Sequence, residues 1–159
     1  MSLQPVIDIQ GVWTRFGDNL VHRDINLSVH RGDMLGLVGG SGSGKTTLLR
    51  EVVGLLEPSQ GNIRLFGEPV NSATPKVRRD LRQRFGMLFQ KGALWSTLSV
   101  AQNVHVPLEL HWRDRDETER AQRVRDVLDW VGLAELADAP VHGLSGGQVK
   151  RAGLARAIV

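Results

Sequence analysis

The sequence predicts an α/β fold, in which a mixed sheet with an antiparallel edge precedes a helical subdomain. Short apolar segments at residues 34–38 and 85–89 are typical of central strands that are buried on both faces. A glycine-rich stretch leads from the first of them into an amphipathic helical pattern. After residue 90 the apolar spacing becomes helical throughout. We therefore expect one domain with two parts, residues 1–89 as the α/β core and residues 90–159 as the helical part.

The remaining elements follow from local patterns and turn signals. Strands are expected where apolar residues alternate or cluster between turns, at residues 6–9, 20–29, 34–38, 61–67 and 85–89. Helices are expected at residues 45–56, 76–84, 100–110, 113–131 and from 148 onward. The second of these helices has a basic face, which we interpret as a solvated surface. Acidic residues near the start of the 113–131 helix interact favourably with the helix dipole. Ser145 is a candidate N-cap of the last helix.

Composition excludes several classes of function. The 159 residues carry a formal charge of only +3, so nucleic acid is not implied as a partner. The chain has no cysteine, which excludes disulfide and thiol chemistry. No apolar run approaches the roughly 20 residues of a membrane helix, and residues 1–5 lack the pattern of a signal peptide. We expect a cytoplasmic protein whose membrane connection comes through a partner.

Residues 39–46 fit the phosphate-binding pattern G-x-x-x-x-G-K-[ST]. A strand followed by such a loop and a helix aims backbone N–H groups at one anion. Lys45 supplies a charge for the β- and γ-phosphates and is assigned a catalytic role, and Thr46 offers a hydroxyl to Mg²⁺. The expected nucleotide contacts are Gly39, Gly40, Ser41, Gly42, Ser43, Gly44, Lys45, Thr46 and Thr47. A Gly/Ser linker does not explain the flanking strand and helix, and Thr47 breaks the dinucleotide fingerprint.

A second motif narrows the class of nucleotide-binding protein. Residues 144–148 read Leu-Ser-Gly-Gly-Gln about a hundred residues after Lys45, and a Lys-Arg pair and Leu-Ala-Arg-Ala follow. This run resembles the signature motif of ABC transporter ATP-binding subunits. Gln90 matches the glutamine of that family's Q-loop, and Phe16 stands where the family places an aromatic residue that stacks on adenine. These motifs, in the family's order, cover nearly the whole chain.

The resemblance implies a RecA-like P-loop NTPase fold that binds ATP and Mg²⁺. It implies that Gln90 has a catalytic role and ligates Mg²⁺. The alternative is that Gln90 is only a polar residue at the end of a strand. The resemblance further implies a head-to-tail dimer under a membrane permease, peripheral on the inner face of the cell membrane. In such a dimer one subunit's signature meets the ATP held by the other subunit, through Ser145, Gly146, Gly147 and Gln148. A helix cap followed by two glycines would explain Ser145 alone.

Residues 88–100, with Asn103, Val104, Pro107 and Leu108, resemble the Mla-type group of the family, which serves phospholipid or organic-solvent resistance transport. Trp95 and Gln148 depart from many relatives, which have Phe and often Met there. We expect a phospholipid or another hydrophobic compound as the transported substrate.

Two elements of the family pattern do not occur in these residues. No acidic residue closes an apolar strand, and none of the five histidines follows the signature. We therefore expect a domain that is incomplete at its C-terminus, with exposed sheet edges, and that binds ATP better than it hydrolyses it. The parent protein is expected to be an ATPase. The alternatives are a non-catalytic nucleotide-binding fragment and a soluble ABC ATPase that serves DNA repair or translation without a permease.

Overall fold

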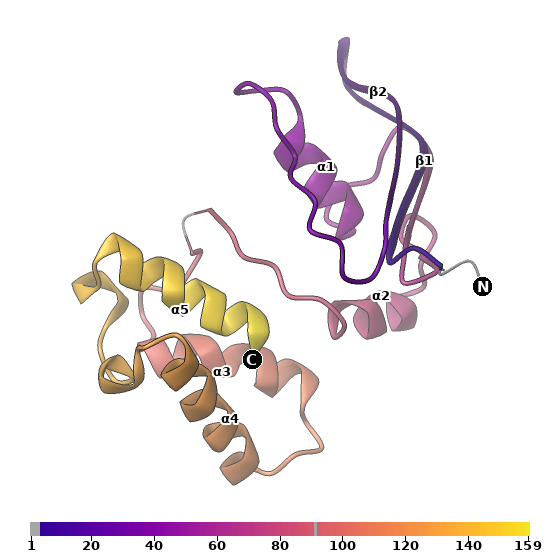
Figure 1. Ribbon diagram of the computed structural model, residues 1–159. Coiled ribbons are helices and arrows are strands. Elements are labelled where there is room, and N and C mark those ends of the chain that lie inside the picture. Colours follow the sequence, from indigo (N-terminus) through magenta and orange to yellow (C-terminus); the bar gives the residue numbers. More distant parts are fainter. Residues whose placement is uncertain (1–3, 91) are drawn as a thin grey trace. The chain divides into compact units, whose positions relative to one another are not determined.

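The computed structural model describes residues 4–90 and 92–159, so residues 1–3 and 91 of the sequence patterns above lie outside the described part. The chain divides into two compact units, residues 1–84 and residues 85–159 (Figure 1). The boundary falls after Arg84, whereas the sequence placed the seam after Phe89. Each unit has its own core and is described separately.

The first unit is built on a four-stranded sheet with the order β2-β1-β3-β4. Its strands are β1 (Ile7–Phe16), β2 (Asn19–Val29), β3 (Gln60–Leu65) and β4 (Glu68–Pro69), and every pairing is antiparallel. A two-residue turn at Gly17 and Asp18 joins β1 to β2, and Gly17 supplies the positive φ of 59° that such turns favour. The predicted antiparallel edge is therefore confirmed.

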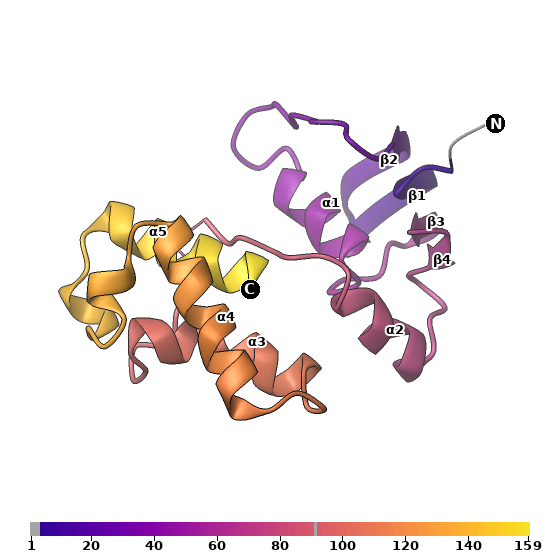
Figure 2. The same cartoon turned by 60° about the horizontal axis from the view of Figure 1, so that its bottom comes forward.

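Helix α1 (Lys45–Val52) lies against this sheet (Figure 2), and α2 (Pro75–Arg82) follows β4. Leu48 and Val52 of α1 are buried with apolar residues of the strands and the following loops, namely Ile9, Val12, Ile63, Leu65, Val70 and Ala73. Thr74 caps α2 by accepting a hydrogen bond from the Val77 N–H, and Pro75 starts the helix with a fixed φ. Only Leu81 of α2 is buried, which agrees with a surface helix.

The two central strands predicted at residues 34–38 and 85–89 are not present as strands. Met34 and Val38 are 100% and 94% exposed, and Leu88 and Phe89 are also exposed. The physical reason is that a parallel central strand takes its hydrogen bonds from neighbouring strands. Within residues 4–90 and 92–159, no strand pairs with either segment.

The second unit is helical and contains α3 (Val100–His111), α4 (Glu117–Trp130) and α5 (Gly146–Ile158), with short 3₁₀ turns at Ala134–Leu136 and Val141–Gly143. The three helices share one apolar core, whose buried members are Val100, Val104, Leu108, Val124, Val127, Leu128, Leu133, Ala152 and Ala155. Asp116 caps α4, and Glu117 and Glu119 lie in its first turn, where the helix dipole favours negative charge. None of the helices in the described part of the chain has the length and apolarity needed to cross a membrane.

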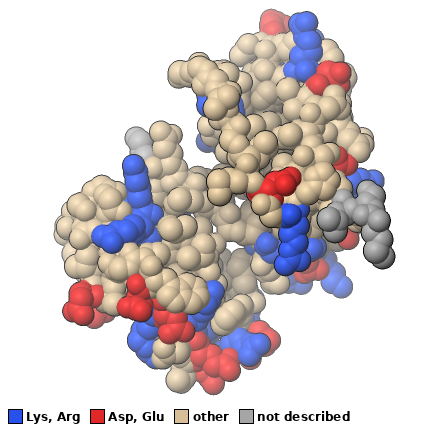
Figure 3. Space-filling model, viewed as in Figure 1, with Lys and Arg blue, Asp and Glu red and all other residues tan. Residues whose placement is uncertain are grey.

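Charge is spread over both units. On the face seen in Figure 3, acidic and basic side chains occur together in each unit. This mixed distribution matches the small net charge and gives that face no extended basic surface.

Candidate functional site

The phosphate loop, residues 39–44, lies in the first unit between the 34–38 segment and α1. The loop turns on itself, with the Ser43 N–H donating to the Gly40 carbonyl at 3.3 Å. A Cβ at Gly39 would lie 2.8 Å from Ser43 Oγ. A side chain at that position would therefore require the Ser43 hydroxyl to move away. Glycine-rich turns of this kind allow the backbone to approach an anion closely.

Lys45 closes this loop. Its Nζ donates to the carbonyl oxygens of Gly39 and Gly40, both at 2.7 Å, and lies 3.1 Å from Ser43 Oγ. The ammonium group is thus held at the mouth of the loop by neutral oxygen acceptors. Phosphate oxygens are stronger partners for an ammonium than neutral carbonyls, because opposite charges attract each other in addition to the hydrogen bond. The arrangement places a positive charge where a polyphosphate would bind.

The N-terminus of α1 is left open for a ligand. Gly44 is its N-cap and makes no side-chain cap, whereas Thr74, Ser99, Asp116 and Ser145 each cap the α-helix that follows them. The first N–H groups of a helix have no partner within the helix, and an anion satisfies them well. Thr46 is exposed in this first turn and Thr47 is half-buried. The loop and helix start therefore fit the phosphates of a nucleotide.

The phosphate loop also suits the expected Mg²⁺, which would take few of its ligands from the protein. Among residues 4–90 and 92–159, no cluster of three or more His, Cys, Asp or Glu side chains could hold a metal ion. Magnesium in nucleotide sites keeps several waters and takes phosphate oxygens in addition to one or two protein oxygens. The exposed Thr46 hydroxyl is suited to be one such oxygen, so the metal would depend on the nucleotide for most of its coordination.

The signature segment starts α5 in the second unit. Ser145 and Gln148 form a capping box, in which Ser145 Oγ accepts from the Gln148 N–H at 3.3 Å and Gln148 Oε1 accepts from the Ser145 N–H at 2.7 Å. The predicted cap is therefore present. Gly146 and Gly147 are exposed, and nothing lies within 4 Å of a Cβ built on either. Their surface is open to a ligand, and nucleotide contact by this segment stays a prediction.

The segment that follows Gln90 is tied to α5. Gln90 itself is exposed, and two residues later the chain meets the guanidinium of Arg156. Arg156 donates to the carbonyls of Gly92 at 2.8 Å and Ala93 at 2.7 Å, and it lies over the Trp95 ring at 5.4 Å. Burial lowers the pKa of Arg156 from its ordinary value, although the group stays charged at neutral pH. The Q-loop segment and the signature helix therefore share one anchor.

The candidate residues fall in different units. Phe16, the phosphate loop, Lys45, Thr46 and Thr47 belong to the first unit, and Gln90 and residues 145–148 belong to the second. Phe16 ends β1 and is 49% exposed, so its ring is accessible for stacking. The structure thus brings the loop, Lys45 and the start of α1 together in one site within the first unit, and the signature segment belongs to the second unit.

Sequence reasoning missed two polar groups next to these sites. One is the Arg156 anchor. The other consists of Thr14, His22 and Glu51, which are buried behind the phosphate loop. A signal for the second was available, because Glu51 stands on the apolar face of α1 between Leu48 and Val52. An acidic residue at such a position needs a buried partner.

A sequence profile of the family described as "ABC transporter" matches residues 22–159, which include the phosphate loop, Gln90 and the signature. The chain belongs to the ABC transporter family. Its match extends over both units. The phosphate loop and the signature helix are therefore parts of one ATP-binding cassette, as the sequence predicted.

Curated relatives of this cassette include two proteins named methionine import ATP-binding protein MetN. The protein from Bifidobacterium longum is 43% identical over 136 residues, and the match covers 85% of this chain and 33% of that relative. The protein from Brucella abortus is 39% identical over 154 residues, covering 97% of this chain and 41% of that relative. The chain thus spans well under half the length of these relatives.

Solved structures confirm the cassette fold. The ATP-binding cassette MJ0796, in a dimeric post-hydrolysis state bound to ADP and Pi, is 27% identical with a TM-score of 0.86, covering 96% of this chain and 68% of that one. The cbiO1 protein of Clostridium perfringens, described as part of the ABC transporter complex cbiONQ, is 30% identical with a TM-score of 0.83. That match covers 98% of this chain and 61% of the other.

Proposed function

We propose that this cassette is the ATP-binding part of an ABC importer subunit, which binds Mg²⁺-ATP at residues 39–47. The observation that carries the proposal is the uncapped start of α1, with Lys45 held across the loop mouth by the carbonyls of Gly39 and Gly40. This site concentrates free N–H groups and one positive charge where a polyphosphate would lie. Phe16 is the proposed stacking contact for adenine.

Hydrolysis by the whole protein requires more than this first site. In the proposal, two copies of the subunit associate head to tail below a membrane permease, on the inner face of the cell membrane. Ser145, Gly146 and Gly147 of one copy then face the γ-phosphate held by Lys45 of the other. The dimeric state named for the MJ0796 cassette supports this arrangement. Mg²⁺ supplies charge neutralisation on the phosphates, and Gln90 is the proposed sensor of metal and γ-phosphate.

Methionine is the proposed transported substrate. Its support comes from the names of the relatives, which match at 39–43% identity over 136 and 154 residues. The expectation of a phospholipid substrate rested on residues 88–100 and finds no support among these relatives. Methionine import therefore replaces phospholipid transport as the substrate to test first.

Replacing Lys45 by Ala in the full-length protein tests both parts of the proposal. Mg²⁺-ATP affinity should fall at least about tenfold, because the loop loses its ammonium and hydrogen bonds between ionised groups contribute about 1.5–3 kcal/mol. Lys76→Ala is the matched control, since Lys76 is also a lysine in the first turn of a helix but lies in α2. Equal ATP affinity in the wild type and Lys45→Ala, with both folded, would contradict the nucleotide site.

The same variant tests the substrate. Cells in which other routes of methionine uptake have been removed should lose uptake of labelled methionine with Lys45→Ala and keep it with Lys76→Ala. Weakened ATP binding without any change in methionine uptake would leave the nucleotide site in place and exclude methionine as the cargo.

A further inference from the structure

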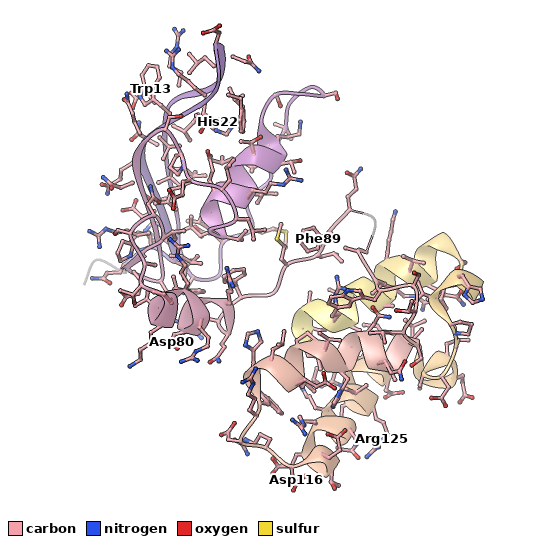
Figure 4. All side chains as sticks on the ribbon, turned by 180° about the vertical axis from the view of Figure 1, so that it is seen from behind. Trp13, His22, Asp80, Phe89, Asp116 and Arg125 are labelled. Atoms are coloured by element: carbon pink, nitrogen blue, oxygen red, sulfur yellow. The ribbon has the colours of Figure 1, made fainter. Side chains whose placement is uncertain are left out.

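A buried polar cluster lies between the sheet and α1, next to the phosphate loop, and nucleotide binding as described above does not use it. The cluster consists of Thr14 on β1, His22 on β2 and Glu51 on α1, which are 2%, 5% and 0% exposed. Thr14 and His22 are directly paired across the two strands. Figure 4 shows His22 on the side of β2 that faces α1. Burying such groups is costly unless they satisfy one another.

The cluster is connected atom by atom. Thr14 Oγ1 lies 2.6 Å from Glu51 Oε1 and 2.9 Å from His22 Nδ1. His22 Nδ1 also lies 3.2 Å from Glu51 Oε2, which is buried and otherwise has no hydrogen bond to any described residue. On the other side of the ring, His22 Nε2 lies 3.2 Å from the carbonyl oxygen of Gly44. The chain of contacts therefore runs from Glu51 through His22 to the last residue of the phosphate loop.

The hydrogen-bond partners determine where protons must lie. A carbonyl oxygen only accepts, so His22 Nε2 must carry a hydrogen to bond Gly44. The Thr14 hydroxyl has one hydrogen and can satisfy only one of its two neighbours. The contact with the Gly44 carbonyl therefore holds the ring with Nε2 as a donor.

This donor acts on a peptide group of the nucleotide site. The Gly44 carbonyl also accepts the first hydrogen bond of α1, from the Leu48 N–H at 2.9 Å. The same planar peptide carries the Lys45 N–H at its opposite end. That N–H is one of the free donors at the start of α1. A second hydrogen bond at the Gly44 oxygen fixes the peptide's direction and polarises its N–H toward a phosphate.

We propose that His22, oriented by Thr14 and Glu51, is a positioning residue that holds the Gly44–Lys45 peptide in its phosphate-binding orientation. The inference depends on the proposed function, because the nucleotide must bind at this loop. In this proposal His22 on β2 and Glu51 near the C-terminal end of α1 both contribute to the affinity for the nucleotide. A role that was only structural would change stability and leave the affinity of the folded protein unchanged.

Substitutions of His22 in the full-length protein test this role. His22→Phe keeps a ring and removes both nitrogens, whereas His22→Gln keeps an N–H donor at the position of Nε2. Mg²⁺-ATP should bind about two- to tenfold more weakly to His22→Phe, the effect of losing one hydrogen bond. His22→Gln should recover most of that affinity. His30→Phe is the matched control, because His30 is an exposed histidine that follows β2.

The outcomes separate this inference from the proposed function. Weaker binding in Lys45→Ala together with unchanged binding in folded His22→Phe would overturn the positioning role alone. Equal losses in His22→Phe and His22→Gln would also overturn it, since the donor would then not matter. Unchanged affinity in Lys45→Ala would overturn the proposed function and the positioning role with it.

A measurement on the wild-type protein tests the same role without requiring that any variant folds. Nitrogen-15 NMR of the His22 ring reports which nitrogens carry hydrogen. We expect a protonated Nε2 whose resonance shifts when Mg²⁺-ATP binds. A ring with an unprotonated Nε2 would overturn the inference, because no hydrogen bond to Gly44 could then exist.

Discussion

Gly44 and Gly42 separate two reasons for having glycine in the phosphate loop. Both have a positive φ, 90° and 80°, which side-chain-bearing residues rarely adopt. Their surroundings differ. A Cβ on Gly44 would lie 2.5 Å from His22 Nε2 and 2.8 Å from Val21 Cγ1, whereas nothing lies within 4 Å of a Cβ on Gly42. Gly44 is therefore required for both conformation and space, and Gly42 for conformation alone.

The two alanine variants should consequently differ in stability. Gly42→Ala should cost about 1–2 kcal/mol, the penalty for a left-handed residue with a Cβ. Gly44→Ala should cost a further 1–3 kcal/mol or so, because a methyl group is forced against a closely packed ring. Urea unfolding of the full-length protein measures both values. Equal destabilisation by the two changes would mean that the His22 ring does not lie against Gly44.

At the scale of single elements, the α-helices in the described part of the chain divide into those whose start is capped by a side chain and one, α1, whose start is open. Ser99 and Ser145 make the same capping box, each accepting from the backbone N–H of a glutamine three residues later. Helix α1 starts at Gly44 without any side-chain cap. The open start is the one that carries the phosphate loop, so its free N–H groups remain available to a ligand.

The two capping serines make a matched pair of substitutions. Ser99→Ala and Ser145→Ala should each lower the free energy of unfolding by about 1 kcal/mol, the usual value of an N-cap. Only Ser145→Ala should also reduce ATP hydrolysis by the full-length protein, since Ser145 alone belongs to the signature. If both variants hydrolysed ATP at the wild-type rate, Ser145 would be a cap and nothing more.

For the whole molecule, the important point is that the candidate groups are divided between two units. Lys45 lies in residues 1–84 and Ser145 in residues 85–159, each anchored within its own unit. In the proposed head-to-tail dimer, each composite site takes Lys45 from one copy and Ser145 from the other. The first unit of one copy and the second unit of the other copy then form each site, so the dimer has two such sites.

Mixing two inactive variants tests this composite site. Full-length Lys45→Ala and Ser145→Arg should each hydrolyse ATP poorly when alone. In a mixed dimer, one of the two sites would have an intact Lys45 and an intact Ser145, so hydrolysis should rise when the proteins are combined, provided that one site is sufficient. Two Lys45→Ala preparations mixed together are the control. No recovery in dimers proven to be mixed would argue against sites shared between copies.

The sequence by itself determined the features that depend on neighbouring residues. The phosphate loop, the Ser145 cap of α5, the antiparallel strands at the sheet edge and the helices of the second unit were predictable, although β1 extends to Phe16 beyond the predicted residues 6–9 and α5 begins at Gly146, before the predicted residue 148. Each rests on contacts among residues a few positions apart, such as the bond between Ser145 and Gln148. The family also followed from these local motifs, because their spacing and order are properties of the chain.

Only the tertiary structure decided which distant residues meet. The segments at residues 34–38 and 85–89 have the composition of buried strands, yet a strand forms only where a partner strand supplies its hydrogen bonds. Likewise, Glu51 meets a threonine 37 residues earlier in the chain, and Arg156 binds carbonyls more than 60 residues away. Local patterns mark such residues as out of place on an apolar face. These patterns do not predict which residue will be the partner, because that depends on how the elements pack in the tertiary structure.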